Sequence, residues 1–489
     1  DRIKGTLEEI PNKMVCDAAN NTYIIGRFSG MVDFDPDPVA THTLTASGSG
    51  HDIFILKLDI NGHFVWVSRL GGSSDDDGIG ISIDASGNLL VCGYFQGSMS
   101  VLIGGGKYTI SSSGLEDAFF AKYNTSGSCL GIWRIGGSGT DEATSVKPGA
   151  GGNIIVGGEY GSLNCDFDPG TGTVHPASFG GMTDEFVASY SGTASFGWVK
   201  CGGDSDNDET SEVVTDLSGN IYACGVAGVG SIDLGGGSMT TAGAPGSGTS
   251  DIFLACYNSG GTHQWSELIG SDSDDVPANM VRDDLGYLYI TGYFSHIIDF
   301  DPGPGILTKT SAGRLDIFIA RFGTDGSLRN VDAFGDVHDD GGHGIAVSAE
   351  LKDIYTTGDF DGTVNFDPFM MAPPLTSVGL TGFGDAFLTR HNWDSLPARL
   401  ASPGIVSQAP AFSVSAYPNP CSGSLVIRNA AAGSVIELYS ADGKKTGSWP
   451  VENEGTFSIG LNAYENGIYF LRIVRPGGAV QNEKIVLQH

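Results

Sequence analysis

The chain has 489 residues, with 75 glycines and a formal net charge of −32. A charge of this sign and size repels phosphate backbones and anionic lipid surfaces, so we do not expect nucleic acid as a partner. No run of about 18 uncharged apolar residues occurs, which argues against a membrane span. The eight cysteines form no CxxC pair, so we do not expect a zinc site. We interpret them as buried small residues, and one or two of the possible disulfide bridges could form among them.

Two sequence markers recur along the chain. The first is a glycine that ends a short apolar run every 65 to 67 residues (Gly26, Gly93, Gly158, Gly225, Gly292 and Gly358). The second is an aspartate that begins an apolar run (Asp52, Asp117, Asp184, Asp251, Asp316 and Asp385). A repeat of this length with several strands per copy is typical of propeller blades, so the six copies predict six blades.

The copy at residues 52–116 shows the content of one repeat. It holds four apolar runs separated by short turn sequences, and Asn61-Gly62 after the first run is a strong hairpin signal. The runs are continuous rather than alternating, which is typical of strands covered on both faces. We therefore expect four antiparallel strands joined by tight turns in each copy.

Tryptophans occupy a repeated place after the marker aspartate. Trp66, Trp198 and Trp265 each lie 14 residues after it, and Trp133 is shifted by two residues, which keeps it on the same strand face. We interpret these side chains as aromatic wedges between neighbouring blades rather than as a platform for a ligand.

The two ends of the repeat region are complementary fragments. Residues 1–28 contain the later strands of a copy, whereas residues 385–392 contain only its first strand. Joining them would complete a sixth blade and close the ring without an exposed edge; a seventh blade would need residues before Asp1. The sequence begins inside a repeat without an apolar leader, so we expect that a signal peptide was removed or not included.

The repeat stops after Trp393, and the composition changes. Residues 397–411 have the Pro, Ala and Ser content of a linker. Residues 412–489 alternate apolar and polar side chains in short runs separated by turn residues. The sequence thus predicts an all-β chain: a six-bladed β-propeller over 1–396, a linker, and a small antiparallel Ig-like β-sandwich over 412–489.

Acidic loops follow the marker glycine in four of the six copies, with the sequence DFDP or NFDP. Their polar residues are candidate oxygen ligands for calcium (Asp33, Asp35, Asp166, Asp168, Asp299, Asp301, Asn365 and Asp367). The alternative is a turn in which the carboxylates cap free amides while the intervening phenylalanine packs inward, and each loop has few carboxylates for calcium. The loops at 101–106 and 231–237 depart from the pattern.

A second acidic set follows the glycine pair of each copy (Glu8, Glu9, Asp75, Asp76, Asp77, Asp141, Glu142, Asp206, Asp208, Glu209, Asp272, Asp274, Asp275, Asp339 and Asp340). Equivalent loops lie on the same rim of a repeat protein, so these carboxylates are expected to ring one face and could attract cations or basic partners. The favoured interpretation is solvated loop charge that keeps the protein soluble.

No catalytic constellation emerges from the sequence. The ten histidines share no repeat position, and no HExxH or GxSxG motif occurs. Paired carboxylates are abundant through repetition, so no single pair identifies a glycosidase. We therefore expect a protein that is not an enzyme and needs no cofactor.

Residues 52–396 resemble the SBBP-type β-propeller repeats of secreted bacterial proteins. The resemblance is carried by the Asp-aromatic strand starts at 52–54 and 316–318, the Gly-Gly-acidic loop at 71–77, and the turn and strand at 84–95. It implies a propeller fold and export, but no common ligand.

The C-terminal region resembles the type A sorting domain of the type IX secretion system. Its motifs match in order, although Leu487-Gln488-His489 replaces the frequent Lys-Gln ending (Tyr417, Pro418, Asn419, Pro420, Gly423, Gly443, Gly467, Tyr469, Leu471, Arg472 and Lys484). The resemblance implies transport of the folded chain across the outer membrane of a Gram-negative bacterium. It also implies that a sortase usually cleaves the domain, with attachment of the cargo to surface lipopolysaccharide or its release.

These features together predict a secreted or cell-surface protein whose propeller acts as an adhesin, a scaffold or a structural subunit. A first alternative is a filament or sheath subunit that retains its C-terminal domain and contacts copies of itself. A second alternative is a secreted enzyme acting on extracellular glycans. The expected partners are the type IX secretion machinery and either the chain itself or a surface glycan or protein.

Overall fold

The structure is a computed structural model in which the chain divides into two compact units, residues 1–397 and 398–489. It describes residues 3–177, 179, 182–242, 249–348, 353–366, 374–378, 384–393, 415–417, 424–430, 432–440, 444–451, 455–464, 466–474 and 480–487. The predicted linker at 397–411 lies outside these residues. The predicted all-β class is confirmed, and within the described residues no helix is long and apolar enough to cross a membrane.

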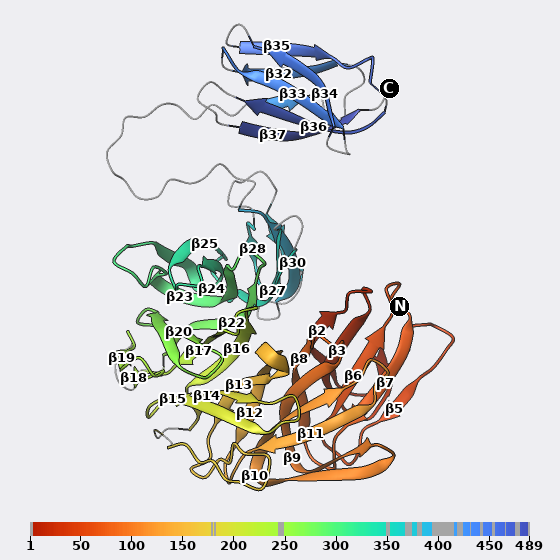
Figure 1. Cartoon of the computed structure of the whole chain (residues 1–489), viewed down its shortest axis with the longest axis vertical. Helices are drawn as coiled ribbons and strands as arrows, with labels where there is room; N and C mark the ends of the chain where they lie inside the picture. The colour runs from red at the N-terminus through yellow and green to blue at the C-terminus, as the bar shows by residue number, and fades with distance from the viewer. Residues whose placement is uncertain are drawn as a thin grey trace. The chain divides into compact units, whose positions relative to one another are not determined.

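The first unit contains six larger antiparallel sheets that follow one another in chain order (Figure 1). The first three sheets are β2 (Glu9–Cys16), β3 (Thr22–Phe28), β6 (Asp52–Leu58) and β7 (Phe64–Leu70); β8 (Asp76–Ile83), β9 (Leu89–Ile103), β10 (Gly106–Tyr123) and β11 (Cys129–Ile135); and β12 (Asp141–Pro148), β13 (Ile154–Tyr160), β14 (Asp184–Tyr190) and β15 (Phe196–Gly202). The next three are β16 (Glu209–Thr215), β17 (Ile221–Ala227), β20 (Asp251–Tyr257) and β21 (His263–Ile269); β22 (Asp275–Arg282), β23 (Leu288–Asp299), β24 (Thr308–Phe322) and β25 (Leu328–Phe334); and β26 (Gly341–Val347), β27 (Ile354–Phe360) and β30 (Asp385–His391).

Short elements complete the unit at its loops. They are β1 (Lys4–Gly5), β4 (Met31–Asp33) and β5 (Thr43–Thr45), the pair β18 (Ser231–Ile232) and β19 (Met239–Thr240), the pair β28 (Thr363–Val364) and β29 (Leu375–Thr376), and the 3-10 turn η1 (Ala150–Gly152).

The strands are grouped differently from the sequence-based prediction. The predicted copy at 52–116 is divided between two sheets, because β6 and β7 join the first sheet while β8 and β9 begin the second. The predicted joining of residues 385–392 to the N-terminal segment is corrected as well: β30 pairs with β27, and the N-terminal β3 pairs with β6. Local turn signals cannot tell a hairpin within a sheet from a connection between sheets.

The first strand of every sheet carries a β-bulge at the same place. The register shifts fall between Pro11 and Lys13 in β2 and at the equivalent place in β8, β12, β16, β22 and β26. One residue of each first strand is therefore left out of the ladder (Asn12, Ile79, Thr144, Ser211, Ala278 and His343). Successive first strands also contact each other along the whole series from β2 to β26.

The bulge explains the marker glycine. A Cβ built on Gly93 would lie 1.9 Å from the carbonyl oxygen of Asp77 in the neighbouring first strand. The same distance is 1.9 or 2.0 Å at all the other marker glycines (Gly26, Gly158, Gly225, Gly292 and Gly358). Two backbones approach here too closely for any side chain, so only glycine fits.

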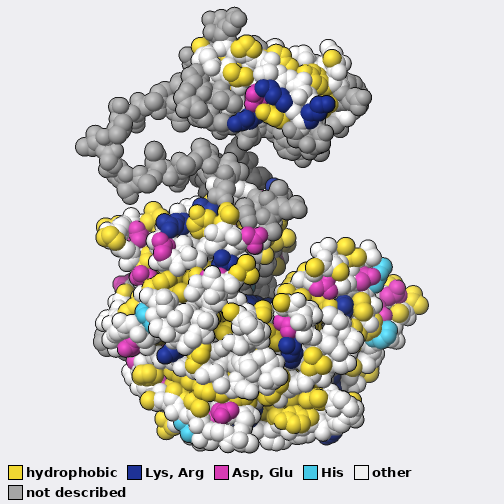
Figure 2. All heavy atoms as spheres, viewed as in Figure 1, with side chains coloured by type: hydrophobic (Ala, Val, Ile, Leu, Met, Phe, Trp, Pro, Cys, Tyr) yellow, Lys and Arg dark blue, Asp and Glu magenta, His cyan; other side chains and the backbone are white. Residues whose placement is uncertain are grey.

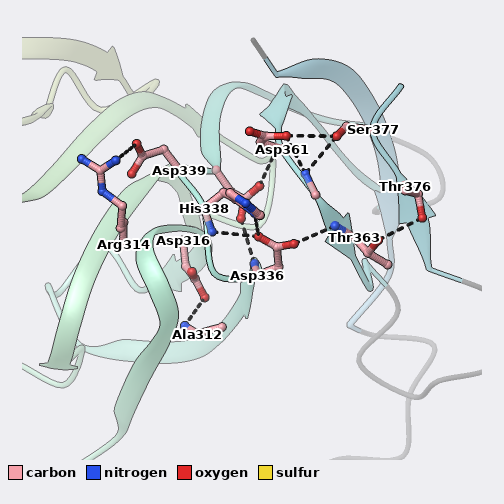
Figure 3. Close-up of polar contacts among 12 residues, drawn as sticks. Ala312, Arg314, Asp316, Asp336, His338, Asp339, Asp361, Thr363, Thr376 and Ser377 are labelled. Carbon is pink, nitrogen blue, oxygen red and sulfur yellow. Dashed lines mark hydrogen bonds and ion pairs between the residues drawn. The ribbon is translucent and has the colours of Figure 1, made fainter. Parts of the chain in front are cut away.

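The marker aspartates are buried and hold the preceding loop. Asp52 accepts a hydrogen bond from the amide of Ser47 at 2.8 Å, and Asp316 accepts one from the amide of Ala312 at 2.9 Å (Figure 3). A Cβ on the glycine that follows each fourth strand would lie 2.1 to 2.5 Å from the aspartate side chain (Gly71, Gly136, Gly203, Gly270 and Gly335). This contact accounts for the repeated glycine of the acidic loop.

The tryptophans lie between successive sheets, as predicted. The indole Nε1 of Trp66 in the first sheet donates to the carbonyl oxygen of Thr125 in the second sheet at 3.0 Å. Trp198 donates to Ser259 at 3.1 Å and Trp265 donates to Thr324 at 2.9 Å, each again in the next sheet. These contacts tie each sheet to the hairpin of its successor.

The apolar core also lies between successive sheets. One cluster joins Ile25 and Ile55 of the first sheet to Val91 and Phe119 of the second, and four further clusters or parts of clusters bridge the later pairs in the same way. Strands such as β14 are buried along their whole length, which confirms that the continuous apolar runs are covered on both faces. The seven cysteines within the described residues are unpaired.

The second unit contains two antiparallel sheets. One has β31 (Ser415–Tyr417), β32 (Ser424–Ala430) and β35 (Gly455–Gly460), and the other has β34 (Lys445–Pro450), β33 (Val435–Ser440), β36 (Gly467–Val474) and β37 (Val480–Leu487). Both contribute to one core, in which Leu425 and Ile427 of the first sheet pack with Leu438 and Leu471 of the second. Two sheets that share a core form a sandwich.

The marker glycine gives a direct test of this packing. We expect Gly93→Ala to lower the free energy of unfolding by about 1 to 3 kcal/mol, because a methyl group has no space against the Asp77 carbonyl. Gly106→Ala is the control, since its Cβ would lie 3.6 Å from the nearest atom. Urea unfolding measures both, and equal stability of the two variants would contradict the close approach.

Candidate functional site

The DFDP loops form turns in which carboxylates accept backbone amides. Asp33 accepts from the amides of Asp35 and His42 at 3.2 and 2.8 Å. Asp166 and Asp299 make the matching pairs of hydrogen bonds in their loops, while Asp168 and Asp301 each accept the amide two residues later. The intervening phenylalanines point inward, and Phe34, Phe167 and Phe300 are fully buried. The turn interpretation therefore accounts for these loops.

Calcium binding by the same loops stays a prediction. Calcium takes about six to eight oxygen ligands, whereas Asp33, Asp166 and Asp299 each have one carboxylate oxygen engaged by two backbone amides. Within the part of the chain that the structure describes, no three or more His, Cys, Asp or Glu residues are arranged to hold a metal ion. Asn365 lies beside β28, and Asp367 lies outside the described residues.

The second acidic set is largely not solvated, which corrects the prediction. One aspartate of each loop after the first is buried (Asp76, Asp141, Asp208, Asp275 and Asp340). Each accepts the backbone amide four residues earlier at 2.7 to 2.9 Å. Burial raises the pKa of Asp76, Asp208 and Asp275 to about 7. These buried aspartates hold the loops by hydrogen bonds and do not form a charged rim.

Exposed members of the set do exist, including Asp75, Asp272 and Asp339. On the face shown in Figure 2, acidic side chains are scattered among other surface types rather than gathered in one band. At the junction of the fifth and sixth sheets, Asp336 accepts the amides of His338 and Thr363 at 2.8 and 2.7 Å (Figure 3). The loops thus use their carboxylates to join neighbouring sheets.

The bulged residues of all six first strands line a single cavity of about 440 Å³, which we call the central cavity. Its lining is Asn12, Lys13, Asp77, Ile79, Thr144, Glu209, Ser211, Val226, Val276, Pro277, Ala278, Asn279 and His343. The six bulged side chains differ in every sheet. A repeated backbone therefore presents a set of side chains that is not repeated, as expected of a binding site.

A buried ion-pair network lies beside the cavity, centred one residue beyond the bulges. Glu212 of β16 contacts Lys13 of β2, and its other oxygen contacts Lys147 of β12 at 2.8 Å. Ser145 donates to the same carboxylate at 2.5 Å and Asn279 of β22 at 3.2 Å. Burial alone would raise the pKa of Glu212, but the two lysines lower it to about 2. The first, third, fourth and fifth sheets thus meet at one carboxylate.

A second layer of carboxylates lies directly after the buried loop aspartates. It comprises Asp77, Glu142 and Glu209, at equivalent places in the second, third and fourth sheets. Asp77 is paired with Arg27 at 2.9 Å. Burial and the neighbouring carboxylates raise the pKa of Glu142 to about 8, and burial with Glu159 raises the pKa of Glu209 to about 7.

The central cavity was not predicted from the sequence. Lys13, Glu212 and Asn279 stand 13 residues before the marker glycine, where the other copies have Gly80, Ser145 and Ile345. The lining carboxylates Asp77 and Glu209 stand 16 residues before it. A comparison of the copies at these two positions would have found them. The bulge between the two positions has no local sequence signal.

Part of the predicted sorting signal lies in the described residues of the second unit. Tyr417, Gly467 and Lys484 lie in strands β31, β36 and β37. In β36, Tyr469 contacts the ring of Tyr464, Leu471 is buried, and Arg472 pairs with Glu437 at 3.4 Å. The remaining residues lie outside the described part (Pro418, Asn419, Pro420, Gly423 and Gly443).

Comparison with known proteins agrees with this assignment of the second unit. Residues 415–488 match the secretion system C-terminal sorting domain. This match supports a type IX secretion substrate that is exported to the cell surface or the extracellular space.

The chain also has distant relatives. It is 24% identical over 369 residues to the regulatory protein FlaEY of Caulobacter vibrioides, covering 71% of this chain and 36% of that protein. It is 23% identical over 287 residues to the uncharacterized WD repeat-containing protein L264 of Acanthamoeba polyphaga mimivirus, covering 50% and 20%. The chain thus spans less than half the length of either relative. PorZ, a surface component of the type-IX secretion system of Porphyromonas gingivalis, matches with a TM-score of 0.27 and 11% identity over 96% of this chain and 69% of the PorZ chain.

The ion-pair network predicts a large effect of one substitution. We expect Glu212→Gln to lower the free energy of unfolding by about 3 to 5 kcal/mol, because it leaves two partly buried lysines without their anion. Arg329→Gln breaks the exposed pair with Asp325, which lies at 3.0 Å, and should cost less than about 1 kcal/mol. Urea unfolding at neutral pH compares them, and a Glu212→Gln variant as stable as the control would contradict the network.

The raised carboxylate pKa values predict a pH dependence of stability. A carboxyl with a higher pKa in the folded state binds more protons there than in the unfolded chain, so stability falls as pH rises between the two values. With folded values of about 8 for Glu142 and about 7 for Glu209, the urea midpoint should be higher near pH 5 than near pH 8.

Replacing both Glu142 and Glu209 by glutamine should reduce the difference in the urea midpoint between pH 5 and pH 8. Asp284→Asn changes an exposed carboxylate and should leave the pH dependence as it is. A double variant with the full pH dependence of the unchanged chain would show that these two groups are not responsible.

Proposed function

We propose that residues 1–396 form a six-bladed β-propeller that is carried to the cell surface or the medium by residues 412–489. The match of residues 415–488 to the sorting domain carries the export part of this proposal. The propeller part is supported by six successive sheets whose first strands all line one cavity, and by the contact between Lys13 and Glu212, which joins the first sheet to the fourth. Strands radiating from a common centre would give both features.

The exported propeller acts as an adhesin, a scaffold or a structural subunit rather than as an enzyme. Its repeated carboxylates are used to fasten loops and to join sheets, as Asp76 and Asp336 illustrate. The central cavity combines apolar and polar side chains that differ in each sheet, which suits recognition. Cleavage of an extracellular glycan by the purified chain would contradict this part of the proposal.

Export can be tested in a Gram-negative bacterium that has type IX secretion. The full chain with a signal peptide should reach the cell surface or the medium, whereas a chain ending at residue 411 should stay in the periplasm, because it lacks the sorting domain. Fractionation with immunoblotting measures the distribution. Circular dichroism of the shortened chain controls for misfolding, and export of the shortened chain would overturn the proposal.

The intact mass of the recovered protein adds a second readout. A mass that ends near residue 411 means that the sorting domain is removed at export, and a full-length mass means that it is retained. A fusion of residues 412–489 to a periplasmic reporter is the matched positive control, and it should move the reporter to the cell surface.

A further inference from the structure

The central cavity contains polar groups that the chain itself does not use. Among the described residues, no hydrogen bond or ion pair reaches the carboxylate of Glu209 or the hydroxyl of Ser211, both on β16. Asn279 of β22 donates its amide nitrogen to Glu212, which leaves its amide oxygen as an acceptor. Acceptors therefore dominate the groups that remain for a ligand.

The basic groups in and beside the cavity are already paired. In the lining, Lys13 contacts Glu212 and His343 contacts Asp359. Beside it, Lys147 contacts Glu212 and Arg27 contacts Asp77. The titratable groups on β16, on the strands that contact it, and in the adjoining loop and cavity lining are Lys13, Asp77, Asp141, Glu142, Lys147, Glu159, Tyr160, Asp184, Glu185, Tyr190, Asp208, Glu212, Tyr222, Cys224, Asp275, Arg282, Tyr293 and His343. The carboxylic acids among them outnumber the basic groups, so the charge balance around Glu209 favours a cationic ligand.

The same cavity also has an apolar part. Ile79, Val226, Val276, Pro277 and Ala278 belong to its lining. A bare metal ion gains nothing from these side chains, and the described residues offer no cluster of metal ligands. A ligand with a hydrocarbon stem and a cationic head uses both halves of the lining.

We propose that the central cavity binds a primary alkylammonium group, such as the lysine side chain of a peptide or a short diamine. The ammonium head donates to Glu209, Ser211 and Asn279, and the methylene stem packs against the apolar side chains of the lining. A primary ammonium has three donors and no acceptor, which matches the acceptors left free. This inference goes beyond export and a surface role, because it names the chemical class of a ligand.

Proton linkage supports the assignment. Burial and the charge of Glu159 raise the pKa of Glu209 to about 7, so this carboxyl is partly protonated near neutral pH. A cation binds the ionised form, and its affinity therefore increases as pH rises from about 6 to about 8.

The test is calorimetric titration of the purified full-length chain with 1,5-diaminopentane. We expect saturable binding, at least about tenfold weaker in Glu209→Gln and unchanged in Asp284→Asn, which alters an exposed carboxylate away from the cavity. Binding should be several-fold stronger near pH 8 than near pH 6, and this dependence should weaken in Glu209→Gln. Glutarate, with carboxylates in place of the amines, should not bind.

A second variant protects the test against a folding defect. Ala278→Leu fills the cavity from the bulge of β22 without changing a charge, and it should also abolish binding while circular dichroism stays unchanged. Absence of diaminopentane binding to the unchanged chain, or binding by either cavity variant that is as strong as that of the unchanged chain, would overturn the proposal. Because the assay uses purified protein, its result is independent of whether the sorting domain directs export.

Discussion

A single close approach between two backbones recurs through the first unit. The carbonyl oxygen that precedes each first-strand bulge lies against the second strand, and no side chain fits between them. The glycine periodicity of the sequence is the consequence of this contact. Because the close approach at the bulge requires a glycine, that residue recurs while the copies diverge elsewhere.

The bulge also separates the residues that form the repeated sheets from the residues that line the central cavity. Side chains along a strand point alternately to the two faces of its sheet. A bulged residue lies outside the hydrogen-bonded ladder, so its side chain does not have to follow this alternation. In the six first strands these residues range from isoleucine and alanine to asparagine and histidine, and all of them line the central cavity. Beside the cavity, Glu212 contacts lysines from two other sheets.

Much of the architecture could be predicted from the sequence, because it rests on local signals. Continuous apolar runs, hairpin turns and the tryptophans after the marker aspartate each act within one strand or between neighbouring sheets, and the structure agrees with them. The assignment of Asp385–His391 was wrong, because strand pairing across a long loop depends on contacts that turns do not specify. Asp76 and its equivalents were predicted to be solvated surface charge. The prediction was wrong because the sequence does not show that the loop folds back, so that the amide four residues earlier donates to the buried carboxylate. The cavity stayed hidden because its residues are the exceptions to the repeat.

The buried loop carboxylates also change how the protein behaves as a charged particle. The formal charge of −32 counts every Asp and Glu as ionised. Asp76, Asp208 and Asp275 have pKa values of about 7, and Glu142 and Glu185 of about 8, so several of these groups hold a proton at neutral pH. The folded chain is therefore less negative than its composition states, while the unfolded chain carries the full charge. Migration in an electric field and retention on an anion exchanger consequently report folding as well as composition.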